Sequence, residues 1–404
     1  MVAPFLPDEE KVAAIRKELP ATGAGVYLDA ATAGPLPAET DRAMREWADW
    51  ELRVGRAGPD ADAEFRARFD EARGTLAAIL VAPAERVGLA PSVGLALRVA
   101  AGARRWRPGE RIVVATSLEP AVLISLAELA ATVGADLETV DLAPNGASGA
   151  PAEGVGPAAE ALRGPLGAGA VLVVAPHVSP HDGSILPVAQ LAEAVHRAGA
   201  WLAVDGSFAV GAVPVDAPSL GADIYATAGD RWLCGPSGTA AVYVGPWLTM
   251  PSTLTGGDGA GPEAGFHRAA VVGLGRSAGW LAMQVGLDWA YSRARHLLEL
   301  AADLLRAIPG VAILAPPDRV GALLAVHVDG WPADRLREEL GRRAFAIVGL
   351  VESAEALRMS IGFWNTEDEI RRFAEALAEL TTTTPERVAR RPPIAIVPAE
   401  RSRA

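Results

Sequence analysis

Lysine is almost absent from this chain of 404 residues. Only two of its 37 basic residues are lysines, Lys11 and Lys17, and the others are arginines. From Glu18 to the last residue, no side chain carries an amine. Chemistry that needs a lysine amine, as a Schiff base, a general base or a phosphate ligand, must therefore use one of these two residues or proceed without one.

Cysteine and long apolar stretches are also scarce. The single cysteine, Cys234, excludes a disulfide framework and a zinc site made of cysteines. No apolar run reaches the roughly 20 residues that span a bilayer. Residues 1–20 lack the apolar core of a secretory signal. We therefore expect a cytoplasmic protein without a membrane partner.

The composition is acidic and globular. The formal net charge is −12, half of the residues are hydrophobic and 21% are charged. No basic stretch offers a surface for phosphates, so we expect no nucleic-acid partner. One His–Asp pair and scattered acids make a poor set of metal ligands, and we expect no metal.

Strand and helix patterns alternate along most of the chain, which predicts a mainly parallel sheet with helices on both faces. Apolar runs predict strands at 111–115, 170–174, 201–205, 224–227 and 240–244. A long helical pattern at 287–308, followed by mixed strand and helix patterns, predicts a second and smaller α+β domain.

Four segments stand out as motifs: VYLDAATAGPLP at 26–37, HVSPHDGSILPV at 177–188, the block at 202–244 and LRMSIGFWNTEDEI at 357–370. Together they resemble the class V aminotransferases, a family of pyridoxal-phosphate (PLP) enzymes that includes cysteine desulfurases and isopenicillin-N epimerase-like proteins. The resemblance implies an α/β protein with the PLP-transferase fold type I, in which helices cover a mainly parallel sheet of the seven-stranded type. It also implies a homodimer with its sites at the subunit interface.

The resemblance sets the expected domain boundaries. Residues 1–29 would join the small domain, 30–285 would form the large α/β domain, 286–382 the small C-terminal α+β domain and 383–404 a flexible tail.

The central motif of the family has changed. Its S-x-H-K-W motif, whose lysine forms the internal aldimine with PLP, reads AGDRW at 228–232, with Asp230 at the histidine and Arg231 at the lysine. A guanidinium stays protonated and is a poor nucleophile, so Arg231 cannot form a Schiff base. The histidine that stacks on the cofactor ring is missing from 117–120.

Two cofactor contacts of the family remain as vestiges. Asp205 matches the acid that pairs with the pyridine nitrogen, and Ser92 belongs to a partly retained phosphate-binding stretch. Because the anchoring lysine is absent and several contacts have changed together, we expect no bound cofactor. PLP or pyridoxamine phosphate held without a covalent link remains an alternative.

The expected fold would bring the remaining polar residues to one cleft, outside the carboxyl ends of the strands. The predicted catalytic residues are His181, Asp205, Asp230 and Arg231. The predicted substrate-binding residues are Arg358, which matches the family arginine that binds a carboxylate, together with Glu119, Asp182 and Phe208.

The leading hypothesis is a PLP-independent enzyme, possessing the fold of this family, that acts on a small carboxylate-bearing, amino-acid-derived substrate in specialised biosynthesis. It would use acid–base and electrostatic catalysis, and lyase, cyclase, isomerase and hydrolase reactions all stay open. The alternatives are a non-catalytic pseudoenzyme or ligand-binding partner of an active paralogue, and a lyase or transferase that holds PLP noncovalently. A usual cysteine desulfurase is excluded because the only thiol, Cys234, lies in the turn after Arg231, where we expect it to be buried.

Overall fold

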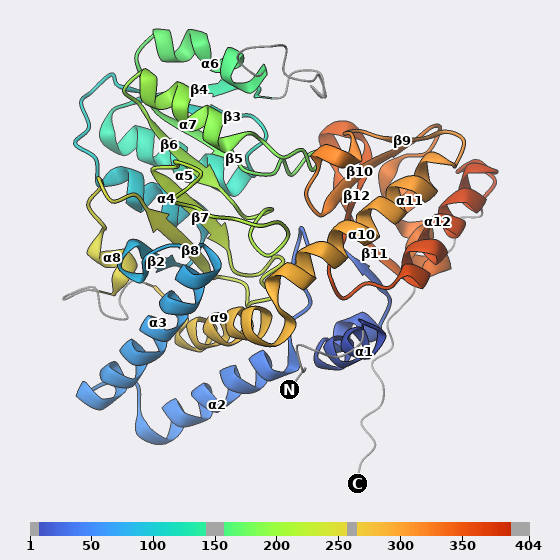
Figure 1. The fold of residues 1–404 in the computed structure, drawn as a ribbon, viewed down its shortest axis with the longest axis horizontal. Helices are drawn as coiled ribbons and strands as arrows, with labels where there is room; N and C mark the ends of the chain where they lie inside the picture. The colour runs from blue at the N-terminus through green and yellow to red at the C-terminus, as the bar shows by residue number, and fades with distance from the viewer. Residues whose placement is uncertain (1–7, 143–156, 257–264, 389–404) are drawn as a thin grey trace.

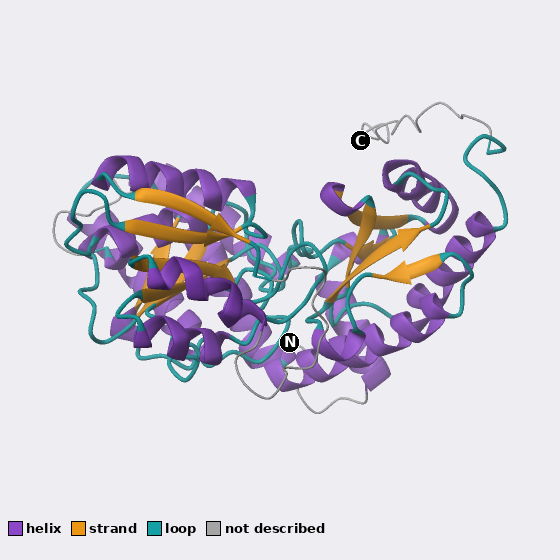
Figure 2. Cartoon of the chain, turned by 90° about the horizontal axis from the view of Figure 1, so that it is seen from above, coloured by secondary structure: helices purple, strands orange, loops and turns teal. Residues whose placement is uncertain are grey.

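The computed structural model describes residues 8–142, 157–256 and 265–388. The chain forms two lobes, each built around one β-sheet (Figure 2). Of the tail predicted at 383–404, residues 389–404 lie outside the described residues.

The larger lobe contains a seven-stranded sheet in the order β2-β8-β7-β6-β5-β3-β4. All neighbouring strands are parallel except β8, which runs antiparallel to β2 and β7. This confirms the predicted mainly parallel sheet. The strands are β2 (Val87–Ala90), β3 (Arg111–Ala115), β4 (Asp136–Val140), β5 (Ala170–Pro176), β6 (Trp201–Asp205), β7 (Ile224–Ala228) and β8 (Ala240–Val244).

Helices cover both faces of this sheet (Figure 1). Some connections run along the sheet toward β4 and others run toward β7. Because each crossover is right-handed, connections in opposite directions place their helices on opposite faces. One face carries α4 and α5 and the other carries α6 and α7. Their bounds are α4 (Val93–Gly102), α5 (Pro120–Val133), α6 (Pro157–Gly167) and α7 (Val188–Arg197). The direction of strand addition reverses between β5 and β3, which makes this the switch point of the sheet.

Helices α2, α3 and α9 lie together at the side of the larger lobe. Helix α9 packs against both α2 and α3, and a short α8 contacts β2. A π-helical turn at Leu281–Val285 then leads into the long α10, which reaches the smaller lobe. The bounds are α2 (Ala38–Val54), α3 (Pro59–Ile79), α8 (Ser252–Thr255), α9 (Arg268–Trp280) and α10 (Leu287–Arg306).

The smaller lobe has a five-stranded sheet in the order β1-β11-β12-β10-β9. Strand β1 comes from the N-terminal part of the chain and pairs in parallel with β11, and the other pairs are antiparallel. The elements are β1 (Val26–Leu28), β9 (Val311–Ile313), β10 (Leu323–Val328), β11 (Ala346–Val351), β12 (Ala356–Ser360), α11 (Ala333–Ala344) and α12 (Glu367–Thr381).

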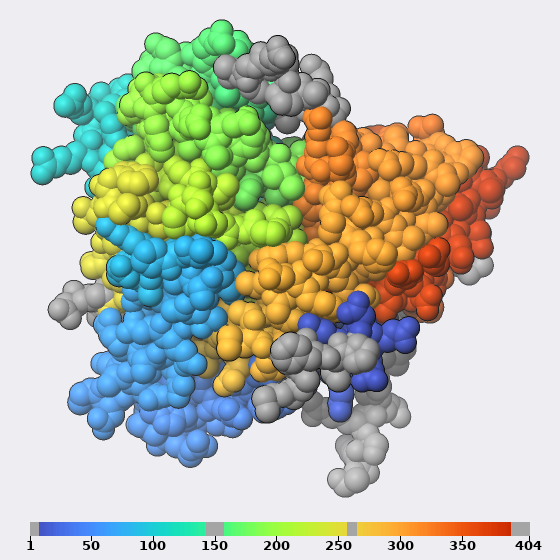
Figure 3. All heavy atoms as spheres, in the orientation of Figure 1, coloured from blue at the N-terminus to red at the C-terminus, as the bar shows by residue number. Residues whose placement is uncertain are grey.

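The N-terminal helix α1 (Asp8–Glu18) is fastened to the last helix of the chain. Arg16 forms a 2.8 Å ion pair with the buried Glu369. Glu369 also completes a capping box with Thr366 at the start of α12, which satisfies backbone N–H groups of the first turn. Figure 3 shows the first described residues lying against the C-terminal elements.

Within the described residues, no helix combines the length and the apolar character that a membrane crossing requires.

Candidate functional site

Parallel strands end together at one edge of the seven-stranded sheet, and the loops that follow them carry most of the predicted site residues. Glu119 lies between β3 and α5, Asp205 is the last residue of β6, and Arg231 follows β7. Arg358 comes from β12 of the smaller lobe. These residues therefore meet beside the switch point, where open α/β sheets bind their ligands.

Asp205 is a buried carboxylate that accepts hydrogen bonds through only one of its two oxygens. Its Oδ1 atom accepts hydrogen bonds from the backbone N–H of Ser207 at 2.9 Å and from the Ser207 hydroxyl at 2.5 Å. In the described part of the chain, Oδ2 accepts none. Burial raises the pKa of Asp205 to about 6, the Ser207 hydrogen bonds oppose that rise, and nearby Glu119 adds to it. A cation placed at Oδ2 would relieve this penalty.

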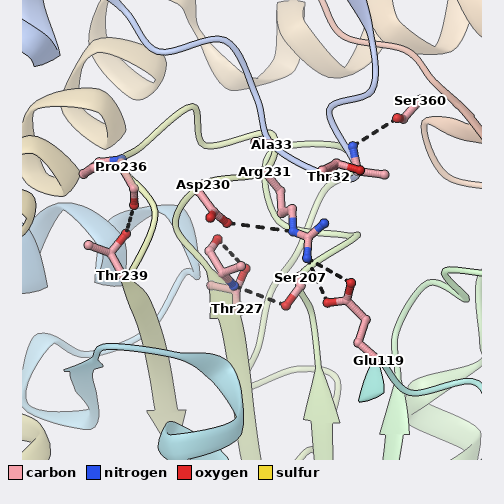
Figure 4. A network of polar contacts seen from close by, with 12 residues as sticks. Thr32, Ala33, Glu119, Ser207, Thr227, Asp230, Arg231, Pro236, Thr239 and Ser360 are labelled. Atoms are coloured by element: carbon pink, nitrogen blue, oxygen red, sulfur yellow. Dashed lines mark hydrogen bonds and ion pairs between the residues drawn. The ribbon is translucent and has the colours of Figure 1, made fainter. Parts of the chain in front are cut away.

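Arg231 and Glu119 form an ion pair across the edge of the sheet (Figure 4). The Nη2 atom of Arg231 donates to both oxygens of the Glu119 carboxylate, at 3.0 and 2.9 Å. The Asp230 carboxylate lies 3.8 Å from Nε of Arg231. That Nε is buried and has no hydrogen-bond acceptor within the described residues.

The ring of Phe208 lies beside two guanidinium groups. The central guanidinium carbon of Arg231 is 5.0 Å from the ring centroid, and that of Arg358 is 5.9 Å away. The ring itself is fully buried. Positive charges at these distances are attracted by the aromatic face, so Phe208 helps to hold both arginines near each other.

Arg358 is held by residues that follow β1. Its Nη2 donates to the Thr32 hydroxyl at 2.9 Å and lies 3.8 Å from Asp29 Oδ1. Gly349, its partner in β11, leaves room for this arrangement: a Cβ there would come within 2.7 Å of Asp29 Oδ1 and 3.1 Å of Arg358 Nε. Asp29, Thr32 and Gly349 were not among the predicted site residues.

The loop after β5 holds the predicted pair of His181 and Asp182. The Asp182 carboxylate accepts hydrogen bonds from the backbone N–H and the hydroxyl of Ser184, at 3.0 and 2.8 Å. Ser184 in turn forms a bridge with Val320 of the smaller lobe. His181 is exposed, and no contact of its ring with Asp182 or Arg231 is found in the described residues. The structure therefore does not assemble these two residues with the cluster around Arg231.

A buried His–Tyr pair lies behind Asp205. The backbone N–H of His177 donates to the backbone oxygen of Asp205 at 2.8 Å. Its Nδ1 is 2.7 Å from the hydroxyl of Tyr225. Burial lowers the pKa of His177 to about 4, so its ring is neutral near pH 7. Tyr225 was not predicted; its position inside the apolar run of β7 gave only the signal of a core residue.

Ser92 is the N-cap of α4. Its hydroxyl accepts a hydrogen bond from the N–H of Leu95 at 3.2 Å, and the residue is exposed. The first turn of a helix carries free N–H groups and a positive dipole end, which together favour a phosphate or other anion.

The only thiol of the chain does not contribute to this region. Cys234 is fully buried, and burial raises the pKa of its thiol, as expected for a packing residue. The described ranges hold no cluster of three or more histidine, cysteine, aspartate or glutamate side chains suited to a metal ion.

The chain is similar to known proteins along most of its length. The model of the aminotransferase class-V family matches residues 26–373. A probable cysteine desulfurase of Methanothermobacter thermautotrophicus is 25% identical, covering 91% of this chain and 97% of that protein. Isopenicillin N epimerase of Streptomyces clavuligerus is 30% identical, covering 79% and 86%. A probable cysteine desulfurase of Mycolicibacterium paratuberculosis is 26% identical over 91% of this chain, which spans only 58% of that protein.

Solved structures share the fold. A cysteine desulfurase from Escherichia coli superposes with a TM-score of 0.74 at 23% identity, covering 91% of this chain and 98% of that one. A variant of the cystine C–S lyase C-DES, in which a lysine is replaced by alanine and glycine is covalently linked to the PLP cofactor, gives 0.78 at 19% identity, covering 90% and 99%. The predicted PLP-transferase fold type I is thereby confirmed.

The expectation of a site without any cofactor is wrong. The match to this family and the solved relative that carries PLP point to PLP instead. The prediction gave too much weight to the missing lysine, although a lysine supplies only one of the contacts that hold such a group. The open oxygen of buried Asp205 suits a protonated pyridine nitrogen, and the N-terminus of α4 suits a phosphate. Arg231 does not suit an aldimine, so the residues fit PLP held without a bond to position 231.

Proposed function

Because the chain belongs to the class V aminotransferase family, we propose that it binds PLP, or pyridoxamine phosphate, without a covalent link and acts on a small amino-acid-derived substrate that carries a carboxylate. Bound at this site, the cofactor would act as an electron sink for bond cleavage at the carbon that bears the substrate nitrogen. The observation that carries the proposal is the buried Asp205 carboxylate, which is open on one oxygen while arginine stands at the lysine position.

Two features support noncovalent binding. The only lysines are on α1, where the ammonium of Lys11 lies 4.2 Å from the centroid of the Trp289 ring on α10, and the described residues show no contact of either lysine with Asp205. In addition, the lysine-to-alanine variant of C-DES carries PLP linked to glycine, so this fold can hold the cofactor when that lysine is absent.

The chain's own residues have separate tasks in this proposal. Asp205 would balance the charge of the pyridine nitrogen, and Arg358 would bind the substrate carboxylate through a charged hydrogen bond. Arg231 provides a fixed positive charge and cannot accept a proton. Asp230, beside Arg231, is the candidate acid–base group. The catalytic role of His181 stays a prediction, since its exposed loop position lends it no contact with these groups.

The binding experiment uses purified protein titrated with PLP. We expect an absorbance band that dialysis removes, and no mass adduct after borohydride, which would convert any imine to a stable amine. Asp205→Asn should weaken PLP binding about tenfold or more, because it removes the charge that pairs with the ring nitrogen. A borohydride-stable adduct on Lys11 or Lys17, or no binding at millimolar PLP, would contradict the proposal.

The ion pair between Arg231 and Glu119 favours one alternative, a non-catalytic member of the family. The pair already engages Nη2 of the guanidinium that stands at the position where the family places its reactive amine. Turnover of any amino acid by PLP-loaded protein, abolished in Asp205→Asn, would remove this alternative.

We also infer that the chain forms a homodimer. Helix α2 ends with strongly exposed apolar side chains: Leu52 is 84% and Val54 is 52% exposed. Exposed apolar residues at the end of a projecting helix are typical of subunit contacts. Light scattering should give twice the chain mass, and Leu52→Asp should shift the population toward the monomer. A monomer at all concentrations would contradict this inference.

A further inference from the structure

We propose that Arg231 and Arg358 together bind a short dicarboxylate. When this ligand is absent, the carboxylate of Glu119 pairs with Arg231 in place of a ligand carboxylate. This inference rests on the proposed function, because it names the substrate class of the same site. The ligand class is an amino- or oxo-dicarboxylate no longer than glutarate.

The spacing of the two guanidinium groups supports one shared ligand. Both lie beside the ring of Phe208, at 5.0 Å for Arg231 and 5.9 Å for Arg358. The two groups can therefore be no farther apart than these two distances combined. Within that limit, a molecule with carboxylates at both ends of a short carbon chain can place one on each group, whereas a monocarboxylate has only one to offer.

The structure already demonstrates how a carboxylate fits Arg231. Glu119 presents both of its oxygens to Nη2, at 3.0 and 2.9 Å. The other nitrogens of this guanidinium make no hydrogen bond within the described residues, and Nε is buried without an acceptor. Leaving a buried charged donor unpaired is costly, so this side of Arg231 favours a further acceptor.

Arg358 is incompletely paired in the same way. Its Nη2 donates to Thr32, whereas its buried Nε has no acceptor in the described part of the chain. The neighbouring Asp29 carboxylate also keeps one buried oxygen, Oδ1, without a donor. The 3.8 Å separation between Asp29 and Arg358 is too long for a hydrogen bond. Thus both arginines keep donors that are unused within the described residues.

Glu119 is consequently a competitor built into the site. A ligand carboxylate must displace a side chain that is tethered at high effective concentration. Removing the charge of Glu119 should therefore strengthen dicarboxylate binding, and removing the charge of Arg231 should weaken it. If the ion pair served only to stabilise the structure, both changes would instead weaken dicarboxylate binding.

The experiment titrates the protein, free of PLP, with malonate, succinate and glutarate, and with acetate and propionate as single-carboxylate probes, by calorimetry. We expect at least one dicarboxylate to bind about tenfold more tightly than the monocarboxylates. Arg231→Gln should abolish this preference, and Glu119→Gln should raise dicarboxylate affinity about fivefold or more.

The matched control is an ion pair of the same residue types on the surface. Arg98 of α4 and Glu128 of α5 are 2.8 Å apart and exposed, so Arg98→Gln and Glu128→Gln should leave both affinities unchanged. Thermal unfolding of each variant establishes that it is folded. Where Arg231→Gln fails to fold, Arg231→Lys keeps the charge but loses the planar fork, and it should reduce the preference.

Equal affinity for mono- and dicarboxylates in the wild type would overturn the proposal. So would a loss of dicarboxylate affinity in both Glu119→Gln and Arg231→Gln. Because these titrations contain no PLP, failure here is distinct from failure of cofactor binding, which the separate PLP titration measures.

Discussion

Two buried aspartates lie at opposite ends of neighbouring strands of the seven-stranded sheet, and they differ in how fully their carboxylates are hydrogen-bonded. Asp223, just before β7, accepts from His196 Nε2 at 2.9 Å, from the N–H of Leu202 at 2.6 Å and from Trp247 Nε1 at 2.5 Å, so both of its oxygens are used. Asp205, at the carboxyl end of β6, is equally buried but uses only Oδ1.

The contrast distinguishes a buried carboxylate that stabilises the fold from one that is available to a ligand. A carboxylate whose two oxygens both accept hydrogen bonds contributes to stability, because those bonds offset the cost of burying its charge. A buried carboxylate with one oxygen that accepts no hydrogen bond within the described residues is available to a ligand at that oxygen. Burial alone would not distinguish these two residues.

The largest expected effect tests the saturated carboxylate. Asp223→Ala removes the acceptor of three donors, of which the buried backbone N–H of Leu202 stays unpaired, and should lower the free energy of unfolding by about 3 kcal/mol in urea denaturation. Asp205→Asn at pH 7 should cause no loss, because it removes a buried charge that lacks a full set of partners. Equal losses in the two variants would break the comparison.

The second prediction concerns pH. With a pKa of about 6 in the folded protein, Asp205 binds its proton more tightly than in the unfolded chain, where the ordinary value is near 4. Its contribution to stability therefore falls as the pH rises from about 4 to about 6, by up to about 3 kcal/mol.

Comparing the wild type with Asp205→Asn isolates this contribution. The two should unfold with similar free energies at pH 4, and the variant should be the more stable one at pH 7. A difference that does not change with pH would mean that Asp205 is not the titrating group.

The third prediction tests how tightly the residues are packed at the carboxyl ends of the strands, where the candidate site lies. A Cβ at Gly206 would come within 2.2 Å of the ring of Tyr225, so Gly206→Ala should destabilise by about 1–3 kcal/mol and weaken PLP binding. Gly74→Ala in α3, where nothing lies within 4 Å, is the matched control and should be neutral or stabilise by up to about 1 kcal/mol. Chemical denaturation of the two variants measures the difference, and equal stability would show that Tyr225 moves aside.

The smallest expected effect is on Arg358. Gly349→Ala would press on Arg358 and Asp29, so it should weaken succinate binding about threefold with little change in stability. Calorimetry with acetate as the second probe checks it. An unchanged affinity would indicate that the guanidinium adjusts freely.

Most of the larger sheet could be predicted from the sequence. Strands β3, β6 and β8 coincide with apolar runs, because a strand covered on both faces needs such residues throughout. Strand β2 was missed, since it is short and contains Gly88. Helix α9 was missed because its glycines weaken the helical pattern; Gly273 and Gly275 approach Met44 of α2 and Ala72 of α3 too closely for larger side chains.

The candidate site was predictable where it depends on the ends of parallel strands. Glu119, Asp205 and Arg231 were expected together on that ground, and the structure brings them together. Asp29 and Thr32 could not be foreseen, because they reach Arg358 only through the pairing of β1 with β11, which joins distant parts of the chain. The Asp182 loop turns toward the smaller lobe through Ser184, a contact that local patterns do not encode.

The pairing of β1 with β11 also has a consequence for biosynthesis. A ribosome releases β1 long before it has made β11, α12 or the glutamate that receives Arg16. The larger lobe can begin to fold while the emerging N-terminal strand still exposes an unpaired edge, which is a template for aggregation. Nascent chains should therefore remain open to chaperones until translation is nearly finished, and the smaller lobe should close last.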